Sequence, residues 1–348
     1  MKRLIALLVV FELILGCAGS TGGGEQAPAG ISGGNGKENA SGQLIVYGSE
    51  YEPAKGGITP GVVPTLNATQ PEYVTNESSP ARNISGFRDL GDAFVFSQRE
   101  NEKLYVYAFD VGYGESILLK KGEFEMLFDC GDEEGGGKVV QQLMGLGVNR
   151  IEAVVITADD EKRWGGIEEV LRNFAVSEIW TDGAEHSDAF TEAVDYNAAQ
   201  SGIPIRHPQA GDAPVFSGVL FRFLNPQEKK PVGSPETNSI VAKVAYGNFC
   251  ALLTSNAETG IESMMMGKGN ITCPVLKVAK YGSGSATSSE FLAVVKPKDA
   301  ILSVGQNSQG NPNSAILERM RVLGIALKRT DRDGGITVES DGKNYTVS

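Results

Sequence analysis

The sequence predicts an α/β protein with two sheets faced by helices, and three observations lead to this prediction. From Leu104 onward, regular apolar segments replace a Gly- and Ser-rich texture. Antiparallel hairpin patterns come first, and strands that alternate with helices follow them. The same alternation then occurs a second time before the C-terminus. Two such runs indicate two sheets faced by helices.

The first half of this segment opens with strands. Aromatic and β-branched residues favour a strand over 104–109, and a hairpin joins 116–119 to 124–128. Residues 131–137 are rich in Gly and acidic residues, so we expect a flexible loop there. The remaining elements predicted in this half are helices over 138–145, 165–173 and 188–200 and strands over 151–156 and 177–180.

The second half repeats the pattern with more strands. Its helices are expected where apolar residues recur at helical spacing, and its strands where short apolar runs end at turn residues. The predicted strands cover 203–206, 219–223, 240–246, 250–254, 275–279 and 300–304, and the helices cover 258–266, 289–295 and 313–323. A terminal strand and hairpin across Asp331-Arg-Asp-Gly334 complete the domain over 326–346.

The amino terminus has the features of a secretory signal. Met1-Lys2-Arg3 is basic, the apolar run that follows is too short to cross a bilayer, and Ile14-Leu-Gly-Cys17 resembles a lipobox. We therefore expect residues 1–17 to be a lipoprotein-type signal peptide ending at Cys17, with Cys17 lipidated. The protein would then lie on the outer face of the cytoplasmic membrane, with the membrane as partner through the lipid anchor. An ordinary signal peptide with an incidental Cys is the alternative.

Residues 18–100 are predicted to be a flexible tether and linker, because Gly, Ser, Pro and Asn bury too little surface to fold. Three glycosylation acceptor patterns, at Asn67, Asn76 and Asn83, give mild support to an extracellular location. The domain that follows is expected to span 101–348.

Charge and cysteine content narrow the class of protein. The formal net charge of −12 opposes nucleic acid as a partner, since such binding depends on Lys and Arg neutralising phosphates. Beyond Cys17 there are three cysteines, Cys130, Cys250 and Cys273, in apolar surroundings without metal-binding spacing. We predict that they are small buried side chains and not a disulfide framework.

Several motifs follow one another along this segment. The first is Phe109-Asp-Val-Gly-Tyr-Gly-Glu-Ser116, the second is Leu127-Phe-Asp-Cys-Gly131, and the third is Ile151-Glu-Ala-Val-Val-Ile-Thr157 with Gly165-Gly-Ile167. Leu252-Leu-Thr254 and Thr330-Asp-Arg-Asp-Gly334 continue the order. These motifs resemble, in turn, the opening motif, the next strand end and the flanks of the zinc motif of the competence (ComEC-type) branch of the metallo-β-lactamase superfamily. The resemblance implies a metallo-β-lactamase-like four-layer αββα sandwich over 101–348.

The positions that match the zinc ligands of that family carry other residues here. They are Ala158, Asp160, Lys162, Arg163, Asn256, Lys280, Tyr281, Asn311 and Asn313. Zinc sites need His, Cys or carboxylate ligands, and the two histidines of the chain, His186 and His207, match none of these positions. His186 is expected on an exposed loop. We therefore predict no metal, no cofactor and no catalytic residues.

The substituted site has three possible interpretations. Its candidate residues are Asp110, Asp129, Asp160, Lys162, Arg163, Asn256 and Lys280. In the first interpretation the cations neutralise carboxylates left without zinc. In the second they form a pocket for an anionic ligand. In the third, Asp110, Asp129, Asp159, Asp160 and Glu161 form an oxygen-ligand site for Ca²⁺, Mg²⁺ or Mn²⁺, which the neighbouring cations oppose.

Three functions follow from these interpretations. The first is a non-catalytic metallo-β-lactamase-fold lipoprotein outside the cytoplasmic membrane that binds an unknown protein or an anionic small molecule. The second, from another class, is an active metal-dependent hydrolase or nuclease of the competence type with an unorthodox metal site. The third is a structural scaffold of the cell envelope.

Overall fold

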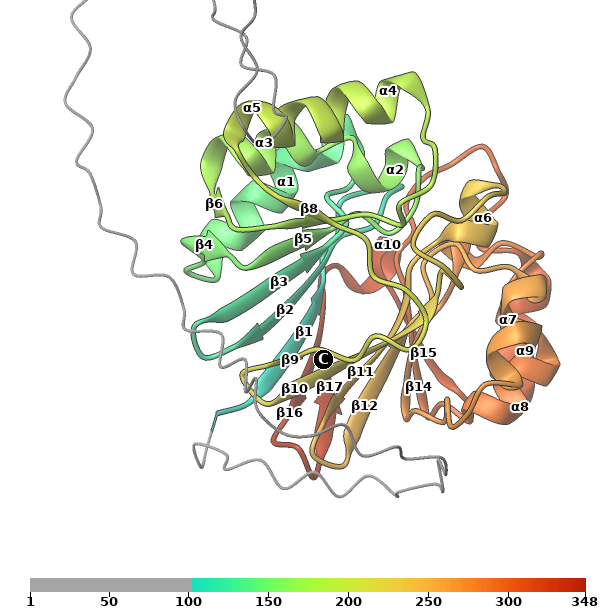
Figure 1. Cartoon of the computed structure of the whole chain (residues 1–348). Helices are drawn as coiled ribbons and strands as arrows, with labels where there is room; N and C mark the ends of the chain where they lie inside the picture. The colour runs from blue at the N-terminus through green and yellow to red at the C-terminus, as the bar shows by residue number, and fades with distance from the viewer. Residues whose placement is uncertain (1–101) are drawn as a thin grey trace, which may run out of the picture. The chain divides into compact units, whose positions relative to one another are not determined.

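The computed structural model describes residues 102–348 (Figure 1). The predicted signal peptide, the lipidation site Cys17 and the predicted tether over 18–100 lie outside the described residues. Among residues 102–348, no helix combines the length and the apolar character that a membrane span requires.

The first sheet has eight strands in the order β17-β16-β1-β2-β3-β5-β7-β8. Strands β1, β2, β3, β16 and β17 pair antiparallel, whereas β3, β5, β7 and β8 are parallel. The bounds are β1 Leu104–Ala108, β2 Ile117–Lys121, β3 Phe124–Phe128, β5 Ala153–Val155, β7 Ile179–Trp180, β8 Ile205–Arg206, β16 Ile336–Ser340 and β17 Tyr345–Val347. A separate pair joins β4 Arg150–Ile151 to β6 Ala175–Val176.

The second sheet has seven strands in the order β15-β14-β13-β12-β11-β10-β9. It is antiparallel from β9 to β12 and parallel from β12 to β15. The bounds are β9 Val215–Phe216, β10 Val219–Asn225, β11 Val241–Tyr246, β12 Phe249–Leu253, β13 Val275–Lys277, β14 Asp299–Leu302 and β15 Ala326–Arg329.

Helices cover the outer face of each sheet (Figure 1). The first sheet carries α1 Glu133–Gly145, α2 Glu161–Trp164, α3 Ile167–Asn173, α4 Asp188–Phe190, η1 Thr191–Tyr196 and α5 Asn197–Ser201. The second carries α7 Thr259–Met266, α8 Ser289–Val295 and α9 Ser314–Val322. The short α6 Pro235–Asn238, η2 Lys280–Gly282 and α10 Thr330–Asp333 lie in connections between strands.

Three apolar clusters hold these layers together. Val106 and Phe128 of the first sheet pack with Phe221 of the second between the sheets. A second cluster joins the second sheet to α7, α8 and α9, and a third joins the first sheet to α1, α3 and α4. Burying such side chains contributes roughly 25 cal/mol per Å² of apolar surface. The arrangement is a four-layer αββα sandwich, as the sequence predicted.

The loop predicted over 131–137 is wrong, because α1 already begins at Glu133. Asp132 is the N-cap, and its Oδ1 accepts a hydrogen bond from the Gly135 backbone N–H at 2.7 Å. The glycines serve close packing: a Cβ on Gly136 would lie 2.7 Å from the Gly166 Cα. The low helix propensity of these residues is therefore offset by the approach of two backbones.

The end of the domain also differs from the prediction. The predicted turn at Asp331 to Gly334 contains α10, and the terminal hairpin instead joins β16 to β17. Asp331 pairs with the Arg329 guanidinium, and Asp333 Oδ2 accepts from the Arg329 backbone N–H at 2.7 Å. These local hydrogen bonds, which the Asp side chains accept, stabilise a helical turn where the sequence suggests a hairpin.

The prediction for the cysteines is wrong in part. Cys250 and Cys273 form a disulfide with a Cα–Cα distance of 5.3 Å, while Cys130 is buried and free. Strand β12 pairs in parallel with β13, and this pairing brings together two cysteines that are 23 residues apart in the chain. The contact depends on a crossover connection, so local composition does not reveal it.

Candidate functional site

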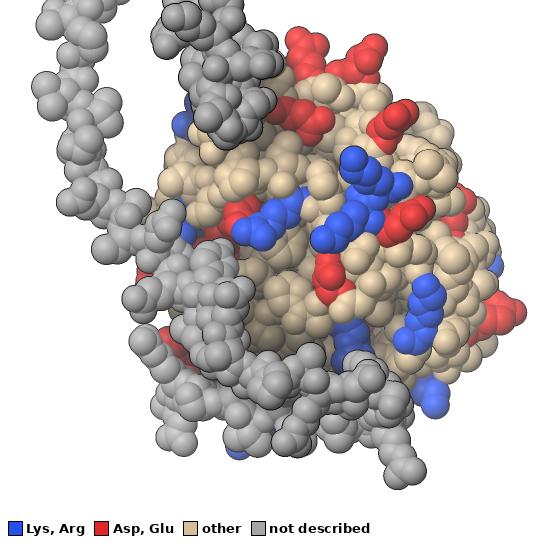
Figure 2. Space-filling model, in the orientation of Figure 1, with Lys and Arg blue, Asp and Glu red and all other residues tan. Residues whose placement is uncertain are grey.

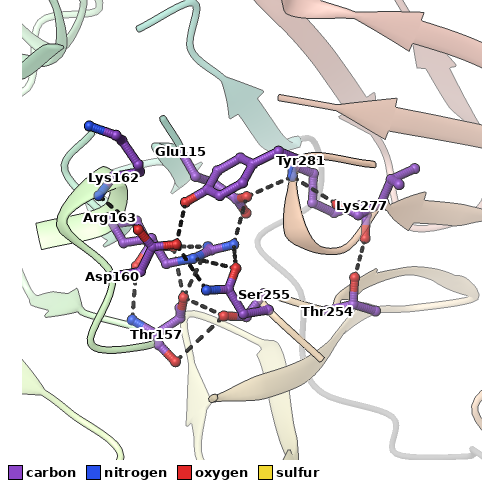
Figure 3. A network of polar contacts seen from close by, with 12 residues as sticks. Glu115, Thr157, Asp160, Lys162, Arg163, Thr254, Ser255, Lys277 and Tyr281 are labelled. Carbon is purple, nitrogen blue, oxygen red and sulfur yellow. Dashed lines mark hydrogen bonds and ion pairs between the residues drawn. The ribbon is translucent and has the colours of Figure 1, made fainter. Parts of the chain in front are cut away.

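The site forms where loops that follow β3, β5, β12 and β13 meet (Figure 3). Asp129, Ser255, Lys280 and Tyr281 all have positive φ angles, between 46° and 61°. Residues other than Gly rarely adopt this conformation, and where they do the surrounding structure must hold it. The backbone of three separate loops is thus fixed around one point.

Arg163, from α2, occupies that point. Its side chain has no exposed surface. Nη1 donates to Asp129 Oδ2 at 2.6 Å and to Thr157 Oγ1 at 3.1 Å, and Nη2 donates to Asn256 Oδ1 at 2.6 Å. Nε donates to the same Asn256 oxygen at 3.0 Å. The Tyr281 ring lies 5.2 Å from the guanidinium carbon, which adds a cation–π contact.

Glu115 and Lys277 extend the cluster beyond the Arg163 guanidinium. Glu115 Oε2 lies 3.2 Å from Arg163 Nη2 and 2.9 Å from Lys277 Nζ, and all three side chains are buried. Burial tends to raise the pKa of Glu115, but the charges of Arg163 and Lys277 outweigh it and lower this pKa. Burial lowers the pKa of Lys277 even though Glu115 is its partner.

Asp129 is held from two directions. Its Oδ1 accepts from the Thr157 backbone N–H and its Oδ2 from the Thr157 hydroxyl, both at 2.8 Å. Ser255 Oγ donates to Thr157 Oγ1 at 2.6 Å, so the second sheet supports the same contact. Burial, with a smaller effect from Glu115, raises the pKa of Asp129 to about 6 against the opposing charge of Arg163.

Asp160 closes the cluster towards the solvent. Its Oδ1 caps α2 by accepting from the Lys162 backbone N–H at 3.0 Å. Its Oδ2 accepts from Asn256 Nδ2 at 3.0 Å and from the Tyr281 hydroxyl at 2.9 Å. Asn256 therefore bridges Arg163 and Asp160, because its oxygen accepts from one and its nitrogen donates to the other.

Four of the seven predicted site residues are brought together, namely Asp129, Asp160, Arg163 and Asn256. The other three have different partners. Lys280 Nζ lies 3.1 Å from Glu236 and 2.5 Å from Glu258, and Lys162 Nζ lies 3.6 Å from Asp132 Oδ2. Asp110 Oδ1 accepts from the Gly112 backbone N–H at 3.2 Å.

The sequence reasoning missed other members of the cluster, which are Glu115, Thr157, Ser255 and Lys277, and it gave Tyr281 no role. Lys277 carried a signal, because it is a cation in an apolar strand that pairs on both sides with buried neighbours. A buried Lys needs an anionic partner, and Glu115 follows directly after Gly114 in the first motif. The hydroxyls of Thr157 and Ser255 carried no comparable signal.

The donors present do not fit a zinc ion. The oxygens that would face a metal already accept hydrogen bonds from the Arg163 guanidinium, which stays charged at any physiological pH. Within residues 102–348, no group of three His, Cys, Asp or Glu side chains is arranged to hold a metal ion. Asp159, a candidate for the oxygen-ligand site, instead accepts from Trp164 and Ser187.

His186 is not the exposed loop residue that the sequence predicted. Its side chain is 7% exposed, and its Nε2 lies 2.7 Å from Asp182 Oδ1. The ring packs against Phe190 at a centroid distance of 3.9 Å. Burial is the largest single effect and lowers the pKa of His186, but the hydrogen bond to Asp182 and the charges of nearby carboxylates together outweigh it and raise this pKa.

Comparison with known proteins adds the following. No family model matches the sequence. The chain is 31% identical over 242 residues to the competence protein ComA of Neisseria gonorrhoeae, which covers 68% of this chain and 32% of that protein. It is 29% identical over 208 residues to the ComE operon protein 3 of Bacillus subtilis (strain 168), covering 59% and 27%. The chain thus spans about a third or less of the length of these relatives.

Among solved structures, the metallo-β-lactamase fold protein YhfI from Bacillus subtilis is 13% identical with a TM-score of 0.47, covering 69% of this chain and 100% of that one. The similarity to these competence proteins agrees with the resemblance that the sequence motifs indicated, and the two mixed sheets have the predicted layers. The described domain is a four-layer αββα sandwich, and over part of its length the chain is distantly similar in sequence to part of the competence proteins ComA and ComE operon protein 3.

Proposed function

We propose that this domain is non-catalytic, is displayed outside the cytoplasmic membrane on a lipid anchor at Cys17, and acts by binding a partner. The observation that carries the proposal is the Arg163 guanidinium, which is fully buried and paired with Asp129, Glu115 and Asn256. A fixed cation of the protein thus provides the positive charge that a metal would provide in an active relative.

The physical argument concerns the water that such hydrolases activate. Metal-dependent hydrolysis requires a bound ion that lowers the pKa of a water molecule towards 7. Here Asp129, Asp160 and Asn256 direct their polar atoms to protein groups instead. An ion could enter only by displacing a guanidinium from buried carboxylates, which would leave a charge without a partner at a cost of several kcal/mol.

The geometry favours neutralisation of carboxylates over capture of an anion at this cluster. Each predicted cation has an acidic partner: Arg163 has Asp129 and Glu115, Lys280 has Glu236 and Glu258, and Lys162 has Asp132. Figure 2 shows acidic side chains beside basic ones on the face it presents. This mixture, with the net charge of −12, supports a protein partner over a nucleic acid.

The disulfide supports the proposed compartment independently of the signal sequence. Cys250 and Cys273 are bonded, and disulfides persist in oxidising compartments and are rare in the cytosol. A lipid anchor at Cys17 would place the domain in such a compartment.

A hydrolysis assay tests the catalytic part of the proposal. The purified chain is incubated with a model phosphodiester and a chromogenic β-lactam, with Zn²⁺ or Mn²⁺ added, beside an active metallo-β-lactamase as positive control. We expect no turnover above that of buffer. Turnover that is abolished by a chelator would support the rival function, a hydrolase with an unorthodox metal site.

Cross-linking on the native membrane tests the binding part. We expect the anchored protein to cross-link to one specific protein, and the same protein should be captured by the described domain alone. Recovery of the protein without any reproducible partner would favour a structural scaffold of the envelope.

A further inference from the structure

A groove of about 690 Å³ lies between the end of β1, the start of β16 and helix α1. Its walls include Tyr107, Asp110, Lys138, Gln141, Gln142 and Gly335. It shares no residue with the Arg163 cluster, and the proposed function does not use it. Asp110 belongs to this groove and not to the cluster in which the sequence placed it.

The aromatic part of the groove comes from the outer face of β1. Along this strand Leu104, Val106 and Ala108 are buried, whereas the alternate residues Tyr105 and Tyr107 are half-buried on the opposite face. Their rings are parallel within 8°, with centroids 5.6 Å apart. Tyr107 thus brings an aromatic ring, supported by that of Tyr105, to the wall of the groove.

The polar part comes mainly from α1. Gln142 Nε2 donates to the Lys138 backbone oxygen at 3.1 Å, which turns its Oε1 towards Gly335. Gln141, one residue earlier, is exposed, and its side-chain amide can donate or accept a hydrogen bond. Asp110 and Lys138 carry opposite charges, so the net charge of the groove favours neither an anionic nor a cationic ligand.

Gly335 leaves space at the other side of the groove. A Cβ at this position would lie 3.6 Å from Gln142 Oε1 and 3.8 Å from the Ala108 backbone oxygen. Both are ordinary van der Waals distances, so a side chain could be accommodated without displacing the backbone. It would occupy the groove.

We propose that this groove binds a neutral oligosaccharide. A sugar hydroxyl both donates and accepts hydrogen bonds, which matches the side-chain amides of Gln141 and Gln142 and the opposite charges of Asp110 and Lys138 in the lining. The apolar face of a sugar ring can pack on the Tyr107 ring. The volume lies within the range of ligand sites, which is roughly 300–1,000 Å³.

The experiment uses the full chain on an array of neutral oligosaccharides, followed by calorimetric titration with the best-bound sugar. The test variants are Tyr107→Ala, Gln141→Ala and Gly335→Ala. The matched controls are Tyr196→Ala and Gln200→Ala, which change an exposed tyrosine on η1 and an exposed glutamine on α5. Gln141 is exposed, so its variant separates loss of binding from loss of folding.

We expect binding by the unaltered chain and a loss of about tenfold in affinity for each test variant, because Tyr107→Ala and Gln141→Ala each remove one contact and the methyl group of Gly335→Ala occupies space in the groove. The controls should bind as the unaltered chain does. Failure of every neutral oligosaccharide to bind at millimolar concentration would overturn the proposal. Binding that all three test variants retain would overturn it as well, because the sugar would then occupy another place.

Discussion

Arg163 Nη1 lies 2.6 Å from Asp129 Oδ2, and neither side chain is more than 1% exposed. The same guanidinium reaches Glu115 through Nη2 at 3.2 Å. One cation thus connects a residue that follows β3 to a residue that precedes β2 and, through Asn256, to a loop of the second sheet. The stability of the domain should depend on this connection.

We predict that Arg163→Met lowers the free energy of unfolding by about 3–5 kcal/mol, because Asp129 and Glu115 would keep buried charges without their shared partner. Urea denaturation measures the change. Arg172→Ala is the matched control, since Arg172 forms only exposed pairs with Glu168 and Glu169, and it should change stability by less than about 0.5 kcal/mol. Equal effects of the two variants would contradict a structural role for the cluster.

Sequence reasoning reached part of this site because the family motifs mark the ends of strands. Asp129, Asp160 and Asn256 each follow a predicted strand, so their proximity could be expected from the fold. The sequence could not show which of two adjacent cations on α2 is buried in the site. Lys162 and Arg163 are neighbours on α2, yet Lys162 is 33% exposed and Arg163 has no exposed surface. The side chains of successive helical residues point about 100° apart around the helix axis. When one side chain faces the core, its neighbour in sequence can therefore face the solvent.

The errors elsewhere have similar causes. The disulfide depends on the pairing of β12 with β13, which is a contact across a crossover connection. The helix at Glu133 depends on the approach of Gly136 to Gly166, which overrides the low helix propensity of Gly. Long-range contacts decide both features. Most strands, in contrast, follow from local periodicity and were predicted, with exceptions that include β9 and the pairing of the terminal hairpin, and the layer order was implied by the family resemblance.

The free energy of unfolding should depend on pH through the protonation of Asp129. Its pKa is raised from 3.8 to about 6 in the folded protein, so between these values the folded state binds more protons than the unfolded state. Stability from this residue is therefore present below about pH 4 and is lost as the pH rises through about 6. We expect the unaltered chain to lose about 2–3 kcal/mol relative to Asp129→Asn between pH 4 and pH 7.

Unfolding free energies of both proteins, measured across this pH range, give the difference. A difference that is independent of pH would mean that Asp129 does not titrate there. A difference of the opposite sign would mean that Arg163 lowers the pKa of Asp129 more strongly than burial raises it.

The disulfide should be detectable by alkylation. In denaturant without reductant, Cys130 should react with iodoacetamide, whereas Cys250 and Cys273 should react only after reduction. Replacing the pair by Cys250→Ser and Cys273→Ser should lower stability by about 2–4 kcal/mol. Peptide mass spectrometry identifies which cysteines are alkylated. Labelling of all three thiols without reductant in protein taken from its own cells would contradict the disulfide.

The anchor lies outside the described residues and is predicted from the signal-like residues 1–17, which end in Ile14-Leu-Gly-Cys17. We predict that the unaltered chain fractionates with membranes and that its mature form begins at Cys17. Cys17→Ser should block processing or release the protein into the soluble fraction. Unaltered protein that is soluble and begins downstream of Cys17 would indicate an ordinary signal peptide.

Metal titration is the most direct test of the proposal that Arg163 takes the place of a metal ion. Calorimetry of the purified chain with Zn²⁺ and with Mn²⁺, together with elemental analysis of the protein as isolated, measures the number of ions bound per chain. We predict less than stoichiometric binding, because the guanidinium holds the oxygens of Asp129 and Asn256. One equivalent of tightly bound metal in the unaltered chain, accompanied by hydrolysis that chelation abolishes, would contradict the proposal that Arg163 takes the place of a metal ion.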